Sequence, residues 1–124
     1  MKKNAGFTLI ELVAVLVILA LLGAMAVPRF TDVSSDALTA AKNGSIAGVR
    51  SGHAMAIAKL KTLPKLSELA TYVGGPNIAT AAGNTGIQVT INGTAYVVET
   101  FTDTIFSTPT GNSTDKVGCV GNIP

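Results

Sequence analysis

The sequence predicts an α+β fold in which a long N-terminal α-helix packs on a small antiparallel β-sheet head. Three observations predict it: an apolar run over residues 7–27, an Ala-rich helical pattern that resumes at Asp32, and two alternating segments joined by Asn92-Gly93. We divide the chain into a short basic segment, an apolar helix, its amphipathic continuation and a small head, at residues 1–6, 7–28, 29–62 and 63–124.

The apolar run is long enough to cross a membrane. It covers 21 residues from Phe7 to Val27, and Glu11 carries the only formal charge among them. At about 1.5 Å per residue, a helix of this length spans roughly 30 Å, the thickness of the hydrocarbon layer. A carboxylate inside such a segment costs about 2.5–3.5 kcal/mol, so Glu11 requires a partner.

The positive charge of the chain is concentrated in front of this run. Nine Lys/Arg oppose seven Asp/Glu, but Lys2 and Lys3 precede Gly6 and leave seven of each sign beyond it. By the positive-inside rule, these two lysines keep the N-terminus cytoplasmic. The cations of residues 59–65 form only a loose group, so no nucleic-acid specificity is evident.

The helix is expected to weaken at the far end of the apolar run and then to continue to Lys61. Pro28 removes a backbone donor and crowds the preceding turn, and Gly23 provides no side-chain support, so we identify these two residues as a helix break. Beyond them, apolar residues recur at three- and four-residue steps, and Pro64 marks the end. These positions are Val33, Ala37, Ala40, Ala41, Ile46 or Ala47, Val49, Ala54, Ile57, Ala58 and Leu60.

The strongest β signal lies in the head. Asn92-Gly93 between residues 87–91 and 94–99 indicates a two-residue type I′ hairpin. Counting outward from the turn gives the register Ile91 with Thr94, Val89 with Tyr96 and Ile87 with Val98. The face formed by Ile87, Val89, Ile91, Tyr96 and Val98 is suited to packing on the Ala-rich helix.

The remainder of the head is predicted from weaker signals. Residues 65–73 are expected to form one short helical turn, and the breaker Gly74-Gly75-Pro76 follows. Residues 79–86 are expected to be loop. Because two strands alone are marginal, we expect at least three, and residues 101–106 are a candidate for the third. Residues 107–124 are expected to wrap the sheet edge as loop.

The polar residues form no recognisable catalytic set. His53 has no carboxylate or thiol at ligand spacing, so we expect it to be packed or solvated. Cys119 is the single cysteine and cannot form an intrachain disulfide. Since neither a Ser/His/Asp set, a paired-carboxylate site nor a phosphate loop is present in the sequence, we expect no enzyme, no metal and no cofactor.

The stretch Gly6-Phe7-Thr8-Leu9-Ile10-Glu11-Leu12 resembles the processing site of type IV prepilins and of the pseudopilins of type II secretion. The resemblance implies that a membrane aspartyl peptidase cuts the leader after Gly6 and methylates the new N-terminal residue, Phe7. It also implies that Glu11 pairs with the Phe7 amine of a neighbouring subunit, which neutralises both charges and fixes an axial stagger. The segment Pro28-Arg29-Phe30-Thr31-Asp32 is similar to that of mannose-sensitive haemagglutinin-type pilins.

The resemblance implies a pilin fold and a structural subunit of a bacterial pilus, used in adhesion, motility or DNA uptake. The implied partners are identical or homologous pilin subunits, the prepilin peptidase and an inner-membrane assembly platform. The subunit would reside in the inner membrane before assembly and then in an extracellular pilus.

Two alternatives stay open. The first is a periplasmic pseudopilin, whose calcium site Asp103 and Asp115 support only weakly. The second is an uncleaved single-span membrane protein whose external hairpin domain binds a partner.

Overall fold

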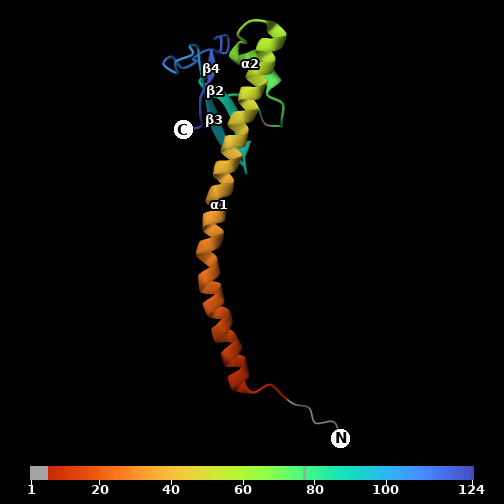
Figure 1. Cartoon of the computed structure of the whole chain (residues 1–124), viewed down its shortest axis with the longest axis vertical. Helices are drawn as coiled ribbons and strands as arrows, with labels where there is room; N and C mark the ends of the chain where they lie inside the picture. The colour runs from red at the N-terminus through yellow and green to blue at the C-terminus, as the bar shows by residue number, and fades with distance from the viewer. Residues whose placement is uncertain (1–5, 77) are drawn as a thin grey trace. The chain divides into compact units, whose positions relative to one another are not determined.

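The computed structural model describes residues 6–76 and 78–124, with the backbone but not the side chains of residues 28–32. These residues form α1 (Leu9–Leu60), α2 (Leu66–Tyr72), β1 (Ala79–Thr80), β2 (Gly86–Ile91), β3 (Thr94–Phe101) and β4 (Cys119–Val120) (Figure 1). The chain divides into two compact units, Met1–Ala37 and Leu38–Pro124. Lys2 and Lys3 of the leader lie outside the described residues, as do the side chains of the segment from Pro28 to Asp32.

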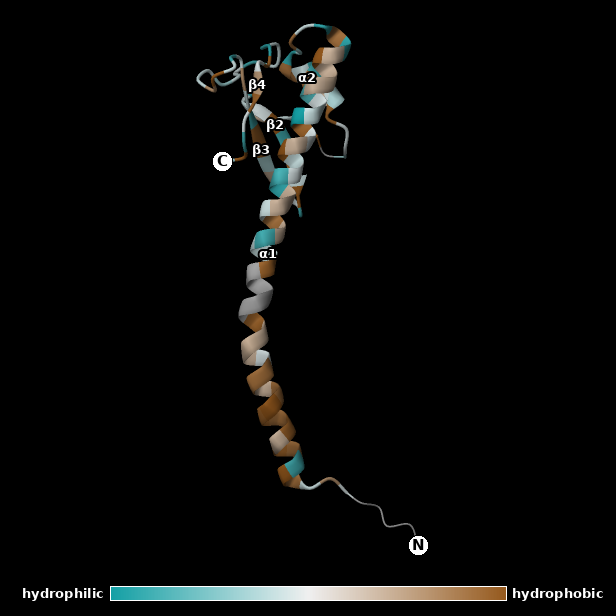
Figure 2. Ribbon diagram, in the orientation of Figure 1, coloured by the Kyte–Doolittle hydropathy of each residue, from teal (hydrophilic) through white to brown (hydrophobic). Residues whose placement is uncertain are grey.

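The first unit contains the N-terminal part of α1. The stretch Leu9–Val27 has a mean hydropathy of 2.8, and none of it is buried within the chain. Figure 2 shows a hydrophobic ribbon over most of this stretch. By length and composition, this part of α1 is long and apolar enough to cross a membrane.

α1 runs through Gly23 and Pro28 without an interruption in its helical assignment. A proline removes one hydrogen bond from a helix and can bend it without ending it, so a weakened position is compatible with continuous helix. The loosening that we expect here during assembly stays a prediction.

α1 ends at Leu60, close to the predicted end. Lys61 adopts a φ of 56° and donates its backbone N–H to Ile57 O at 2.8 Å, which is the left-handed C-terminal turn that closes many helices. Pro64 follows, and α2 then begins at Leu66, within the short helix predicted for residues 65–73.

The hairpin is confirmed in its register. β2 and β3 are antiparallel, and Ile91 lies opposite Thr94, Val89 opposite Tyr96 and Ile87 opposite Val98. Asn92 and Gly93 at the turn have φ values of 50° and 80°, the positive values that a type I′ turn requires.

The sheet has at least three strands, as expected, but residues 101–106 do not supply the third. β3 ends at Phe101, and the outer strands of the four-stranded sheet, in the order β1-β2-β3-β4, are β1 and β4. Both lie in segments that we expected to be loop. Each is two residues long, too short for an alternating pattern to appear in the sequence. The chain turns back after Thr102 because Asp103 accepts hydrogen bonds from Ser107 and Thr108.

The core of the second unit lies between α1, α2 and the sheet. Its buried hydrophobic cluster consists of Ile46, Val49, Leu66, Leu69, Val73, Ile87, Val89, Val98, Val117 and Val120. Three of the five residues of the predicted sheet face are buried, whereas Ile91 and Tyr96 are half-buried. On α1 the buried residues include Ile46, Val49 and Ala56. Among the apolar positions predicted for this part of the helix, Ile46 and Val49 are buried and Ile57 is half-buried, whereas the exposed ones are Ala40, Ala41, Ala54, Ala58 and Leu60. Each fully buried Val, Leu or Ile contributes about 1.5–3 kcal/mol to folding.

Gly52 brings α1 close to the end of α2. A Cβ at this position would lie 2.8 Å from Val73 Cγ2 and 3.1 Å from the Tyr72 carbonyl oxygen. Gly52 therefore permits a close approach that a side chain would prevent, and this approach positions the chain that leads from α2 into the sheet.

Candidate functional site

The predicted processing site lies in front of the first helix. Gly6 and Phe7 are exposed and precede Leu9, where α1 begins, and the Phe7 side chain is 87% exposed. The Gly6–Phe7 peptide bond is therefore free of helical hydrogen bonding and lies in the kind of exposed backbone that peptidases cut most readily.

Thr8 and Glu11 form a capping box at the start of α1. Glu11 Oε2 accepts hydrogen bonds from the Thr8 backbone N–H at 2.9 Å and from the Thr8 hydroxyl at 2.8 Å. The Glu11 backbone N–H reaches back to Thr8 Oγ1 at 3.4 Å. Two backbone donors that the helix cannot satisfy are thereby paired.

Our sequence reasoning missed this role of Thr8. The signal was present, because Thr8-Leu9-Ile10-Glu11 has the Thr-x-x-Glu spacing of a capping box directly before an apolar run. The structure therefore gives Glu11 a function within its own helix in addition to the pairing with another subunit that we predict. The carboxylate also lies at the positive end of the helix dipole, which favours its charge.

The capped helix presents an apolar surface on all its sides. The large hydrophobic residues from Leu9 to Val27 are all exposed, and Ala26 alone of this stretch is half-buried. A helix that is apolar all round must be covered by lipid or by other helices, since soluble proteins rarely leave apolar patches above a few hundred Å² in water. This stretch is thus a candidate for spanning a membrane or for packing against other helices.

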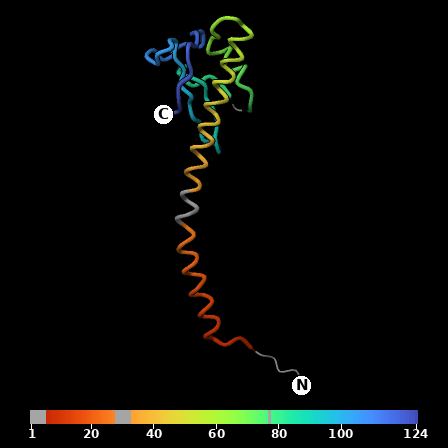
Figure 3. The backbone as a smooth tube through the Cα atoms, viewed as in Figure 1, coloured from red at the N-terminus to blue at the C-terminus, as the bar shows by residue number. Residues whose placement is uncertain are grey.

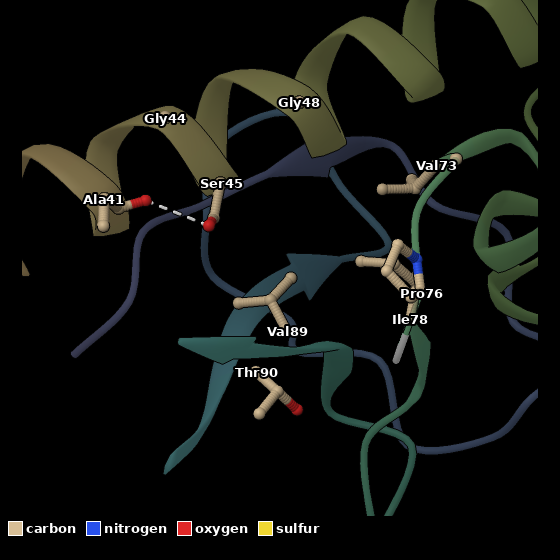
Figure 4. A pocket seen from close by; sticks show the side chains of 10 residues that line it. Ala41, Gly44, Ser45, Gly48, Val73, Pro76, Ile78, Val89 and Thr90 are labelled. Carbon is tan, nitrogen blue, oxygen red and sulfur yellow. Dashed lines mark hydrogen bonds between the residues drawn. The ribbon is translucent and has the colours of Figure 1, made fainter. Parts of the chain in front are cut away.

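A groove of about 370 Å³ lies in the second unit, between α1 and the chain that follows α2 (Figure 4). Its lining consists of Ala41, Gly44, Ser45 and Gly48 on α1, and of Val73, Gly74, Pro76, Ile78, Val89 and Thr90. A Cβ at Gly44 or Gly48 would meet nothing within 4 Å, so the groove is open above both glycines. Titratable side chains are absent from this lining, which gives the groove the character of a packing surface.

The C-terminal segment, residues 117–122, is attached to α1 by the side chains of Arg50 and His53. Arg50 Nη2 donates to Gly121 O and to Asn122 Oδ1, both at 3.2 Å, and His53 Nε2 donates to Val117 O at 2.9 Å. Because a carbonyl only accepts, His53 Nε2 carries a proton. Figure 3 shows this segment returning beside α1. His53 is thus packed in a structural role.

Backbone hydrogen bonds extend this attachment around the edge of the head. The Val117 N–H donates to Pro64 O at 2.9 Å, and the Leu66 N–H donates to Asp115 O at 3.0 Å. The buried hydroxyls of Thr100 and Thr110 are 2.7 Å apart and hydrogen-bonded. Cys119 takes part through its backbone, which pairs with Phe101 between β4 and β3, whereas its thiol is free.

Asp103 and Asp115 each close a turn of their own loop. Asp103 accepts from the Ser107 hydroxyl and from the backbone N–H groups of Ser107 and Thr108, and Asp115 accepts from the N–H groups of Gly111 and Asn112. The hydroxyl of Ser107 is the main reason that the pKa of Asp103 falls from 3.8 to about 2. The Gly111 N–H, followed by that of Asn112, lowers the pKa of Asp115.

These turns are expected to open in acid. Because the pKa of Asp103 is lower in the folded loop, its charge stabilises the loop fully above about pH 3.8 and loses this effect as the pH falls towards 2. In an NMR titration of the full chain in detergent, the amide signals of Ser107 and Thr108 should shift with a midpoint near pH 2. The Gly93 amide, at the hairpin turn, is the internal control. A midpoint near 3.8 would contradict the hydrogen-bonded turn.

Two comparisons with known proteins bear on these features. Residues 1–27 match the family model described as the prokaryotic N-terminal methylation motif. The chain is also 42% identical over 67 residues to the type IV narrow pilus major component PilA5 of Thermus thermophilus. That match covers 54% of this chain and 58% of the relative, so the chain spans less than two thirds of the relative's length. No solved structure matches the chain.

Proposed function

We propose that this chain is a type IV pilin and a structural subunit of a pilus filament, which its N-terminal methylation motif and its similarity to a type IV pilin support. The observation that carries the proposal is the apolar start of α1, exposed on all sides, with a single capped carboxylate at Glu11 and the Gly6–Phe7 bond directly before it. Such a helix inserts into the inner membrane and then packs against the same helix of other subunits.

The proposed assembly step joins two charges. Cutting after Gly6 by the prepilin peptidase produces a free amine at Phe7, which is methylated. Glu11 Oε2 is held by Thr8, and Oε1 accepts no hydrogen bond within the described residues. That oxygen is available to the Phe7 amine of a neighbouring subunit, and the pair then enters the filament core as a neutral unit.

We favour an extracellular pilus over a periplasmic pseudopilus. The oxygens of Asp103 and Asp115 accept hydrogen bonds from their own turns, which makes them poor candidates for the calcium site of a major pseudopilin. Adhesion, motility and DNA uptake are the roles we expect of such a fibre. Imaging shed fibres from cells with and without this chain tests the choice, because the absence of fibres that contain it contradicts a major pilin.

The intact mass of the native protein tests the processing on which assembly depends. We expect a mass that begins at a methylated Phe7 and that lacks residues 1–6. A mass that begins at Met1 would instead support the uncleaved single-span protein with a binding head. Gly6→Leu is the matched variant: a larger side chain at the cut should block the peptidase, leave Met1 in place and stop assembly.

A further inference from the structure

A second hollow in the head lies at the C-terminal segment and has a different character from the groove of Figure 4. It has a volume of about 340 Å³ and is lined by Arg50, Glu99, Phe101, Phe106, Gly121 and Asn122. These residues come from α1, from β3, from the loop after β3 and from the segment after β4. We call it the aromatic pocket.

Two phenylalanine rings form the apolar part of the aromatic pocket. Phe101 and Phe106 meet edge to face, with their ring centres 5.4 Å apart and their planes at 73°. Gly121 makes room for this arrangement, since a Cβ there would lie 2.8 Å from Phe101 Cε2. A side chain at residue 121 would therefore require the Phe101 ring to shift away from the backbone.

Phe106 is held in an unfavourable conformation that keeps its ring exposed. Its φ is 58°, which is rare for an aromatic residue, and its side chain is 53% exposed. The Asp103 turn, with its hydrogen bonds from Ser107 and Thr108, fixes the chain on the C-terminal side of this residue. Strained residues that the surrounding structure holds in place concentrate at binding sites.

Opposite charges line the aromatic pocket without pairing. Within the described residues, the Glu99 carboxylate accepts no hydrogen bond and forms no ion pair, although Arg50 lines the same pocket. Arg50 uses Nη2 for Gly121 and Asn122, which leaves the N–H groups of Nε and Nη1 without a partner in the described part of the chain. A ligand can therefore meet a cation and an anion at separate points.

We propose that the aromatic pocket binds a zwitterion that joins a quaternary ammonium to a phosphate, as the phosphocholine group does. Aromatic rings attract quaternary ammonium through their negative faces, and Glu99 adds a full negative charge beside them. The remaining N–H groups of Arg50 match phosphate oxygens. A simple cation would be repelled by Arg50 and a simple anion by Glu99, whereas a neutral sugar would leave both charges without a partner. The proposal does not depend on filament assembly.

Saturation-transfer NMR on the full chain in maltoside micelles tests the proposal with phosphocholine as the probe. Saturation of the protein should pass most strongly to the N-methyl protons, because these lie against the phenylalanine rings. Phe106→Leu and Glu99→Gln should each weaken binding roughly three- to tenfold. The matched controls are Ile105→Ala, an exposed apolar residue beside Phe106 that does not line the pocket, and Asp36→Asn, which removes a carboxylate from the other unit.

Further probes test which groups of the ligand are recognised and whether the ligand is a lipid headgroup or a free monoester. Choline alone and inorganic phosphate should bind several-fold more weakly than phosphocholine. Glycerophosphocholine carries the singly charged phosphodiester of a lipid headgroup, so tighter binding of this compound identifies a lipid source, and tighter binding of phosphocholine identifies a free monoester. The proposal is overturned if neither compound receives saturation, or if Phe106→Leu and Glu99→Gln bind both as well as the controls do.

Discussion

Replacing Glu11 with valine is expected to leave membrane insertion and removal of the leader intact and to reduce incorporation into filaments by more than about tenfold. In the filament core that we propose, the variant would leave the Phe7 amine of a neighbouring subunit without a counter-charge. Breaking a buried ion pair by removing one partner costs about 3–5 kcal/mol, which is more than enough for this effect. Filament yield per cell, measured against the amount of processed subunit in the membrane, gives the result.

Valine removes both the charge of Glu11 and its capping hydrogen bonds with Thr8. Two further variants separate these two functions. Glu11→Gln keeps an oxygen that can accept from Thr8, but it removes the charge. Thr8→Ala does the reverse, since it removes the hydroxyl partner and keeps the carboxylate. If the charge sets the register between subunits, Glu11→Gln should fail to assemble and Thr8→Ala should assemble. The opposite outcome, in which Thr8→Ala fails to assemble and Glu11→Gln assembles, would show that capping, which is worth about 1 kcal/mol, is the dominant role.

Gly86→Ala is expected to destabilise the head by about 2–3 kcal/mol. Gly86 is buried at the start of β2, opposite Glu99. A Cβ at this position would lie 2.1 Å from the Val98 carbonyl oxygen and 2.9 Å from its carbonyl carbon. Both are backbone atoms, so no side-chain rotation can relieve the contact, and β2 and β3 must separate. Thermal unfolding of the full chain, followed by circular dichroism, should show a midpoint lower by roughly 10–20 °C.

Gly111→Ala is the matched control for this substitution. Gly111 lies in a loop of the same unit, and a Cβ there would meet nothing within 4 Å. Its hydrogen bond to Asp115 uses the backbone N–H, which alanine retains. We expect its unfolding midpoint to match that of the unaltered chain. A midpoint for Gly86→Ala that also matches would mean that β2 and β3 do not approach as closely as described.

Local signals were sufficient for the parts of the fold that are built from neighbouring residues. Asn92-Gly93 determined the turn, and the turn determined every pair from Ile91 outward, because the side-chain alternation of strands allows no slip of one residue. The ends of α1 and α2 likewise followed from proline and from apolar periodicity. The Thr8–Glu11 capping box was also local, and its spacing would have been sufficient to predict it.

The parts that could not be predicted depend on residues far apart in the chain. Arg50 and His53 bind residues 64 to 72 positions away, and neither the arginine nor the histidine carries a local sign of its partner. β1 and β4 exist only because the longer strands β2 and β3 offer free edges to them. The aromatic pocket likewise joins α1, β3 and two later segments, and only the folded chain brings these together.

The attachment of the C-terminal segment by Arg50 and His53 determines how this edge of the head can open. In a domain that is closed by a disulfide, release of such a segment requires a reductant. Here the segment is held by hydrogen bonds and by the buried Val117 and Val120, so its release is a thermal fluctuation whose frequency is independent of redox potential. The amides of Val117, Gly118 and Gly121 should therefore exchange with solvent hydrogen by a local opening, before the head unfolds as a whole. A head whose C-terminal segment opens and closes reversibly can deform under mechanical load without breaking a covalent bond.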